Sequence, residues 1–86
     1  LKENLEAIPN ALAKVQALTG YTFDRKDTGE RQTGLIAQDV EKVLPEAVGE
    51  NNGTMTLAYG NLVGLLVEAI KELKAEVEEL KNGSSN

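Results

Sequence analysis

The chain contains neither cysteine nor histidine among its 86 residues. The lack of cysteine excludes disulfide bridges and thiolate zinc sites, and the lack of histidine excludes His-based catalytic triads and imidazole pH switches. Aromatic residues are also few, with two tyrosines and one phenylalanine. A chain this short without disulfides or metal lies near the limit of what one hydrophobic core can stabilise, and such chains often complete their core by oligomerising.

Positive charge is scarce as well: the chain has 9 lysine and arginine residues and 14 acidic residues, for a net charge of -5. Nucleic acids and anionic membrane surfaces are bound through basic patches, so the composition predicts neither partner. The longest apolar-rich region, 57–70, is interrupted by glycines and polar residues and is too short to span a bilayer. The amino terminus lacks the apolar stretch of a secretory signal. We therefore expect a soluble single domain.

The sequence predicts an α+β fold whose globular part covers residues 1–58. Pro9 suits the first position of a helix over 10–18, and Gly20 is expected to end it in the left-handed conformation. Two β-hairpins and a short helix should follow. The first hairpin pairs 21–26 with 31–36 around 27–30, with Tyr21 and Phe23 on one face. The helix covers 37–44 and stops at Pro45. The second hairpin pairs 47–49 with 54–58 around the turn 51–53, where Asn-Gly is the hairpin signal.

A long helix over 59–81 carries the clearest pattern. Six apolar residues repeat with heptad spacing and form an a/d stripe, which predicts a parallel coiled coil: Val63, Leu66, Ile70, Leu73, Val77 and Leu80. Glu76 and Lys81 occupy g and e positions, where opposite charges pair between parallel chains. The first half of the helix is apolar over a wider face, including Leu62, Leu65, Val67 and Ala69, and should pack against its own domain as well.

The alternative to a coiled coil is one amphipathic helix folded onto the globular part, and this reading is strongest at Leu66 and before. The heptads alone do not decide between a dimer and a trimer, since β-branched a residues with leucine at d favour two strands and a fused domain can override that preference. Residues 82–86 are expected to be a disordered tail after the helix ends.

No residue pattern indicates an active site, a metal site or a cofactor. Asp24, Asp27 and Glu30 flank a turn, but their spacing fits no calcium loop. Ser84 and Ser85 lie in the expected tail and are poor candidates for a nucleophile. On composition and spacing, the chain is a small acidic oligomerising domain with no cofactor and no metal.

The segment Gly34-Leu35-Ile36-Ala37-Gln38-Asp39-Val40-Glu41-Lys42-Val43-Leu44-Pro45-Glu46 resembles the intramolecular chaperone domain of phage tail spikes and tail fibres. The opening Leu1-Lys2-Glu3-Asn4, the segment Thr28-Gly29-Glu30-Arg31 and the helix from Tyr59-Gly60-Asn61-Leu62-Val63 onward are similar to the same family. Endosialidase tail spikes and the myelin regulatory factor carry related domains. The resemblance extends over nearly the whole chain, in the family's order.

The resemblance implies a homotrimer at the carboxyl end of a fibrous protein. Such a domain registers three chains whose upstream β-structural part, its folding client, folds only as an intertwined trimer. It then releases itself with a serine–lysine pair in a segment of the form Ser-Asp-x-Arg-Leu-Lys. Lys2 matches the lysine, the general base, and the serine would lie five residues earlier, before Leu1. The chain would then resemble the released product, made in the host bacterial cytoplasm and absent from the mature virion.

Two other functions remain open from the sequence. The domain could be a permanent trimeric tip, or foldon, that stays on its fibre, or a coiled-coil adaptor that binds a partner helix without proteolysis. A serine at the expected distance upstream would favour self-release over a permanent tip. Self-association of the isolated domain would exclude a monomeric adaptor.

Overall fold

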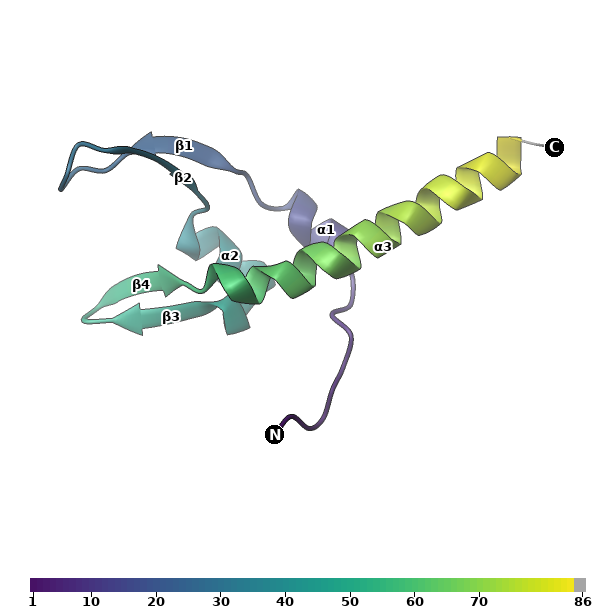
Figure 1. Ribbon diagram of the computed structural model, residues 1–86, viewed down its shortest axis with the longest axis horizontal. Coiled ribbons are helices and arrows are strands. Elements are labelled where there is room, and N and C mark those ends of the chain that lie inside the picture. The colour runs from purple at the N-terminus through teal and green to yellow at the C-terminus, as the bar shows by residue number, and fades with distance from the viewer. Residues whose placement is uncertain (85–86) are drawn as a thin grey trace.

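The computed structural model describes residues 1–84 and places a long helix, α3 (Tyr59–Ser84), against a group of short elements (Figure 1). The α+β prediction with two hairpins and a long carboxyl-terminal helix is confirmed. In chain order the elements before α3 are α1 (Ala11–Gln16), β1 (Tyr21–Asp24), β2 (Arg31–Gly34), α2 (Ala37–Val43), the 3₁₀ helix η1 (Pro45–Ala47), β3 (Val48–Asn51) and β4 (Thr54–Leu57).

The four strands form two separate antiparallel hairpins, β1–β2 and β3–β4, rather than one sheet. Val48 pairs with Leu57 and Asn51 with Thr54, so Asn52 and Gly53 are the two turn residues. Both have positive φ, 52° and 80°, as a two-residue Asn-Gly turn of type I′ requires. Both hairpins extend to the same end of the molecule, opposite to the free end of α3 (Figure 1).

Helix α1 differs from its prediction at both ends. Pro9 precedes the helix instead of occupying its first position, because Asn10 takes a left-handed conformation with φ 53° and the helix begins at Ala11. At the other end the Ala17 N–H bonds to the carbonyls of Ala13 and Lys14, which closes the helix in a tight turn. Gly20 has no positive φ and does not act as the predicted cap.

The core lies where α1, α2 and η1 meet the first half of α3. Among the described residues its seven buried members are all apolar: Ala11, Val40, Leu44, Ala47, Leu62, Leu65 and Ala69. Val40 lies in α2 and Leu44 directly follows it, and Val43 packs at the edge of the same cluster. A core of this size explains why the short elements stay together, but it leaves the hairpin tips and the second half of α3 outside.

The molecule is extended, measuring 57 × 35 × 19 Å, with a radius of gyration of 16.6 Å. A compact domain of this length is expected to have a radius near ~12 Å. The chain exposes 6922 Å², whereas a compact monomer of its mass would expose about 4,900 Å². The excess, about 2,000 Å² by this scaling, is enough for interfaces of standard size with two neighbours.

Helix α3 also runs further than predicted, through Ser84 rather than stopping near Lys81. Neither Asn82 nor Gly83 is a proline, so both can adopt helical backbone angles and the last turn continues through them. The helix therefore includes 82–84, the first part of the segment predicted as a disordered tail. The rest of that predicted tail, Ser85 and Asn86, lies outside the described residues.

Candidate oligomerisation surface

Helix α3 carries two adjacent apolar stripes, of which one is buried and the other is exposed to solvent. Leu62, Leu65 and Ala69 fall at spacings of three and four residues and are all buried in the chain's own core. The second stripe is the predicted a/d stripe, turned roughly a quarter of a helical circumference away at ~100° per residue. The wide apolar face seen in the sequence is thus divided between an internal contact and a free surface.

The a/d stripe is exposed along its whole length. Val63, Ile70 and Leu80 are 57%, 66% and 73% accessible, and the three remaining predicted interface residues are also exposed: Leu66, Leu73 and Val77. Water-facing leucine, isoleucine and valine in a continuous helical stripe are the surface that a second helix covers in a coiled coil. The six predicted residues are available for self-association, and the number of chains stays a prediction.

A carboxylate ends the buried stripe. Glu72 continues its spacing after Ala69, and its two oxygens accept the backbone N–H groups of Ala11 at 2.8 Å and Leu12 at 3.0 Å. These are the first N–H groups of α1, which have no partner within the helix, and Asn10 offers no side-chain cap. Glu72 was not singled out from the sequence. A charged residue at a position that continues a buried stripe is the signal that could have identified it.

Tyr59, at the beginning of α3, holds the first hairpin against the helix. Its hydroxyl accepts the Leu35 N–H at 3.2 Å, directly after β2. The approach depends on Gly34, because a Cβ at that position would lie 2.5 Å from the Tyr59 hydroxyl oxygen. Tyr59 also lies four residues before Val63, at the d position that precedes the stripe, so a residue that bonds to the hairpin is next in line to the proposed interface.

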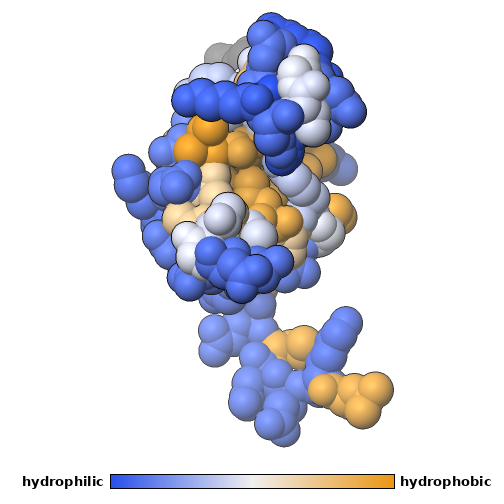
Figure 2. All heavy atoms as spheres, turned by 90° about the vertical axis from the view of Figure 1, so that its left-hand side faces the viewer, coloured by the Kyte–Doolittle hydropathy of each residue, from blue (hydrophilic) through white to orange (hydrophobic). Residues whose placement is uncertain are grey.

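A cleft of about 350 Å³ with a mixed polar and apolar lining separates the two hairpins and was not predicted. Phe23 lies on the β1–β2 side, Met55 and Leu57 lie on the β3–β4 side, and Ile36 and Tyr59 lie at the base. Figure 2 views the molecule from the hairpin end and shows this hydrophobic surface between two hydrophilic regions. Isolated two-stranded hairpins are marginally stable in water, so these apolar faces are surfaces that a partner can stabilise.

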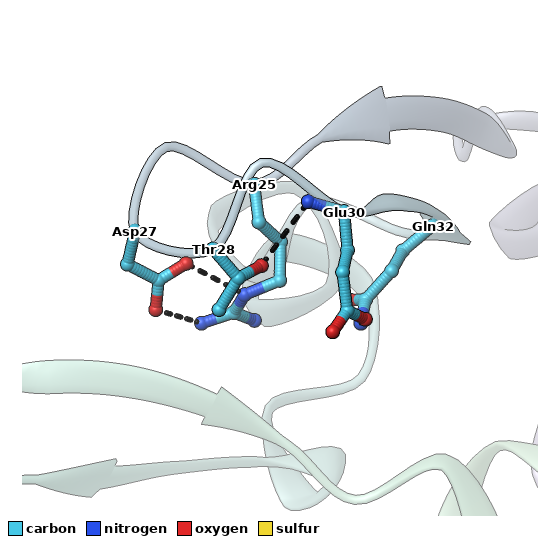
Figure 3. A network of polar contacts seen from close by, with 5 residues as sticks. All are labelled: Arg25, Asp27, Thr28, Glu30 and Gln32. Carbon is cyan, nitrogen blue, oxygen red and sulfur yellow. Dashed lines mark hydrogen bonds and ion pairs between the residues drawn. The ribbon is translucent and has the colours of Figure 1, made fainter.

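The tip of the first hairpin is held by a local polar network (Figure 3). The Arg25 guanidinium donates two hydrogen bonds to the Asp27 carboxylate, at 2.9 and 2.8 Å. These hydrogen bonds and the charge of Asp27 raise the pKa of Arg25, and the hydrogen bonds to Arg25 lower the pKa of Asp27. Gly29 completes the turn with φ 76°. The network orders the tip and presents no catalytic arrangement.

Lys2 lies in the extended segment that leads away from the domain to the amino terminus (Figure 1). Its side chain is exposed, and so are the flanking Leu1 and Leu5. Ile8 is the first residue of this segment to pack against the core, close to Gly64 on α3. The single chain therefore holds the predicted general base away from its domain.

Within residues 1–84 no helix is long and apolar enough to cross a bilayer. The same part of the chain holds no cluster of acidic residues suited to a metal ion.

Comparison with known proteins finds one family and several phage relatives. Residues 1–49 match the family described as chaperone of endosialidase. The long tail fiber protein Gp37 of Enterobacteria phage K3 is 39% identical over 92 aligned positions, covering 95% of this chain and 7% of that protein. Gp37 of phage M1 is 40% identical (94% of this chain, 37% of that protein), and Gp37 of Salmonella phage S16 is 33% identical (94% and 12%). The chain thus spans well under half the length of these relatives.

Proposed function

Since the chain belongs to the chaperone of endosialidase family, we propose that it is the carboxyl-terminal intramolecular chaperone of a phage tail fibre or tail spike. It would trimerise, bring three fibre chains into register, and then be released by serine–lysine self-cleavage. The observation that carries the proposal is the exposed a/d stripe of α3, next to a second stripe that is already buried in the same chain.

Trimerisation would assist the fibre by proximity. Intertwined β-structure formed from three separate chains is slow to fold and exposes aggregation-prone edges. Linking three chain ends through a small domain with mostly local contacts raises the effective concentration of the fibre chains around one another. The two hairpins extend to one end of the molecule and present Phe23, Met55 and Leu57 to the cleft between them, and they are suited to contact the upstream β-structural client.

Self-release would use Lys2 and a serine that precedes Leu1 in the precursor. The neutral lysine amine takes the serine proton as the serine oxygen attacks the scissile carbonyl, and it returns the proton to the leaving group. A lysine ammonium ordinarily titrates near ~10.4, and burial away from water favours the neutral amine. Because the single chain leaves Lys2 in water, packing in a trimer would supply that burial and make cleavage depend on assembly.

The test is a precursor that carries its natural preceding residues, expressed as wild type, Lys2→Ala and Ile70→Asp. Mass spectrometry should find two products for the wild type and one uncut chain for each variant. Lys14→Ala is the matched control for loss of a lysine and should cleave normally. Normal cleavage by a monomeric Ile70→Asp precursor, shown by sedimentation, would refute the link between assembly and cleavage.

The same experiment separates the other functions. A trimer with one uncut product and no upstream serine would indicate a permanent tip. A monomer in sedimentation would indicate a coiled-coil adaptor.

Cleavage in the host bacterial cytoplasm also implies that peptides of residues 1–81 are missing from purified virions, which proteomic analysis of the particles measures directly.

The hairpin turns can be tested separately for client contact. Deleting 51–54, the tip of β3–β4, should leave the trimer intact and reduce the yield of folded fibre. Unchanged fibre yield would exclude this tip as a client contact, whatever the result for self-cleavage.

A further inference from the structure

Val67 of α3 is an exposed apolar residue that belongs neither to the buried stripe nor to the a/d stripe. It is 48% accessible, although the sequence groups it with Leu62, Leu65 and Ala69, which are buried. In the heptad register set by Val63 and Ile70 it occupies position e, at the edge of the a/d stripe. Its free side chain therefore faces a neighbouring helix if one lies on the stripe.

The surface on the opposite edge of the stripe is hollowed. An apolar hollow of about 320 Å³ opens between α1 and α3. Its walls are the end of α1, the residue after β2 and the first half of α3, represented by Val15, Leu18, Leu35, Tyr59, Leu62 and Leu66. A cavity of about 150 Å³ can hold a benzene ring, so this hollow has room for a branched aliphatic side chain and part of a neighbouring one.

The heptad register brings these two features together between chains. In a parallel coil, a residue at g lies beside the residue at e that is five positions later in the adjacent chain. Leu62 occupies g, so its counterpart in the adjacent chain is Val67. Leu66 belongs both to the exposed stripe and to the wall of the hollow, and Tyr59, at the d position that precedes the stripe, also lines that wall. A helix that covers the stripe therefore also covers the hollow's mouth.

We infer that Val67 of one chain fills the hollow between α1 and α3 of the adjacent copy, so that the domain's core is completed only in the oligomer. This inference rests on the proposed trimer. It adds to the coiled-coil contact along the a/d stripe a second contact, between Val67 and the hollow of the adjacent chain. A consequence follows for the first hairpin, because Leu35 and Tyr59, which anchor β2, form one wall of the hollow. Assembly would then hold the hairpin in place.

Disulfide trapping tests the contact, since the chain has no cysteine of its own. In Leu62→Cys/Val67→Cys the two sites of one helix are about 9 Å apart at Cα, beyond the ~7 Å limit for a disulfide, so a bond can form only between chains. Mild oxidation of the 86-residue chain should give a covalent trimer on a denaturing gel. Leu62→Cys/Lys71→Cys is the control, because position 71 faces away from the stripe, and it should remain uncoupled.

The outcomes distinguish this inference from the proposed function. A trimer in sedimentation without the 62–67 disulfide would overturn the inference and leave the chaperone proposal standing, whereas absence of any oligomer would overturn both. A disulfide that joins Leu5→Cys to Leu62→Cys would instead assign the hollow to the amino-terminal segment. If position 67 became inaccessible to solvent only when the fibre client was added, the hollow would be assigned to the client. Either result would overturn the inference.

A second measurement covers the case in which the double cysteine variant does not assemble. Val67→Asp would place a charge in an apolar site and should weaken trimer association at least about tenfold. Ile36→Asp, similarly exposed but outside the hollow, should not. Equal trimer dissociation constants for the two variants would overturn the inference.

Discussion

The Glu72 carboxylate of α3 caps the amino terminus of α1, with Oε2 accepting the Ala11 N–H at 2.8 Å across 61 residues of sequence. A six-residue helix cannot form alone in water, and α1 has neither an acidic residue in its first turn nor a side-chain cap of its own. The contact therefore joins the formation of α1 to its position on α3.

Glu72→Ala should lower the free energy of unfolding by about 1–2 kcal/mol, because it leaves two N–H groups at a partly buried helix end without an acceptor. Chemical denaturation at fixed protein concentration measures the change. Glu79→Ala, at the same heptad position one repeat later and exposed, is the control and should stay within about 0.5 kcal/mol of wild type. Equal losses in both variants would mean that the cap is not what stabilises α1.

Gly34 and Tyr59 should show strong energetic coupling. Gly34→Ala places a methyl group 2.5 Å from the Tyr59 hydroxyl and must displace the ring, which breaks the bond to the Leu35 N–H. We expect a loss of about 1 kcal/mol, the usual net value of one hydrogen bond. Tyr59→Phe removes both the clash and the bond, so Gly34→Ala should cost clearly less in that background.

Unfolding measurements on the two single variants and the double variant give the coupling energy. Gly20→Ala is the control, because a Cβ at Gly20 would meet nothing within 4 Å and its φ is not positive. Additive effects of the two changes would contradict the contact.

Local patterns were sufficient for most of the fold. Asn52-Gly53 predicted the second hairpin because two residues with positive φ are needed there, and the heptads predicted α3 because its apolar residues share one face. These signals lie within a few residues of one another. The predicted ends of α1 were wrong because local patterns do not contain the information that sets them. The helix begins where Asn10 adopts the left-handed conformation and where the distant Glu72 carboxylate accepts its first N–H groups.

The candidate site was only half visible in the sequence. The heptad periodicity predicted the exposed stripe. Periodicity could not show which of the two adjacent apolar stripes is buried in the chain's own core. That division depends on where α1 packs, and Leu62 and Val67 have similar hydrophobicity but opposite exposure. The hairpin cleft was not predictable either, because it depends on how two separate hairpins are oriented about Tyr59.

The tip of the first hairpin should respond to acid through Asp27. Its pKa in the folded chain lies below the ordinary value of 3.8, chiefly because Arg25 donates hydrogen bonds to the carboxylate. A group with a lowered folded pKa stabilises the fold above its unfolded value, and the contribution is lost as the pH falls through the folded pKa. The turn should therefore stay ordered at pH 4 to 5 and loosen only at lower pH, with a small effect on overall stability because the pair is exposed.

An NMR titration of the Asp27 carboxyl carbon and the Arg25 Nε–H between about pH 6 and pH 2 measures this. Arg25→Gln should bring the Asp27 pKa back toward its ordinary value. A midpoint in the wild type at or above the ordinary value would contradict the pair.

The two stripes of α3 should give two different phenotypes when each is changed. Leu65 is 1% accessible and belongs to the chain's own core, so Leu65→Ala should destabilise the domain by about 2–5 kcal/mol at every protein concentration. Ile70 is 66% accessible, so Ile70→Asp should leave the fold of the single chain intact and act only on association.

Association of folded chains makes the melting temperature rise with protein concentration. Thermal unfolding over a hundredfold range of concentration should therefore show a rising midpoint in the wild type, a flat one in Ile70→Asp, and a lowered but still rising one in Leu65→Ala. Circular dichroism at low concentration checks that Ile70→Asp keeps its helix content. A rising midpoint in Ile70→Asp would place the contact between chains on a surface other than the a/d stripe.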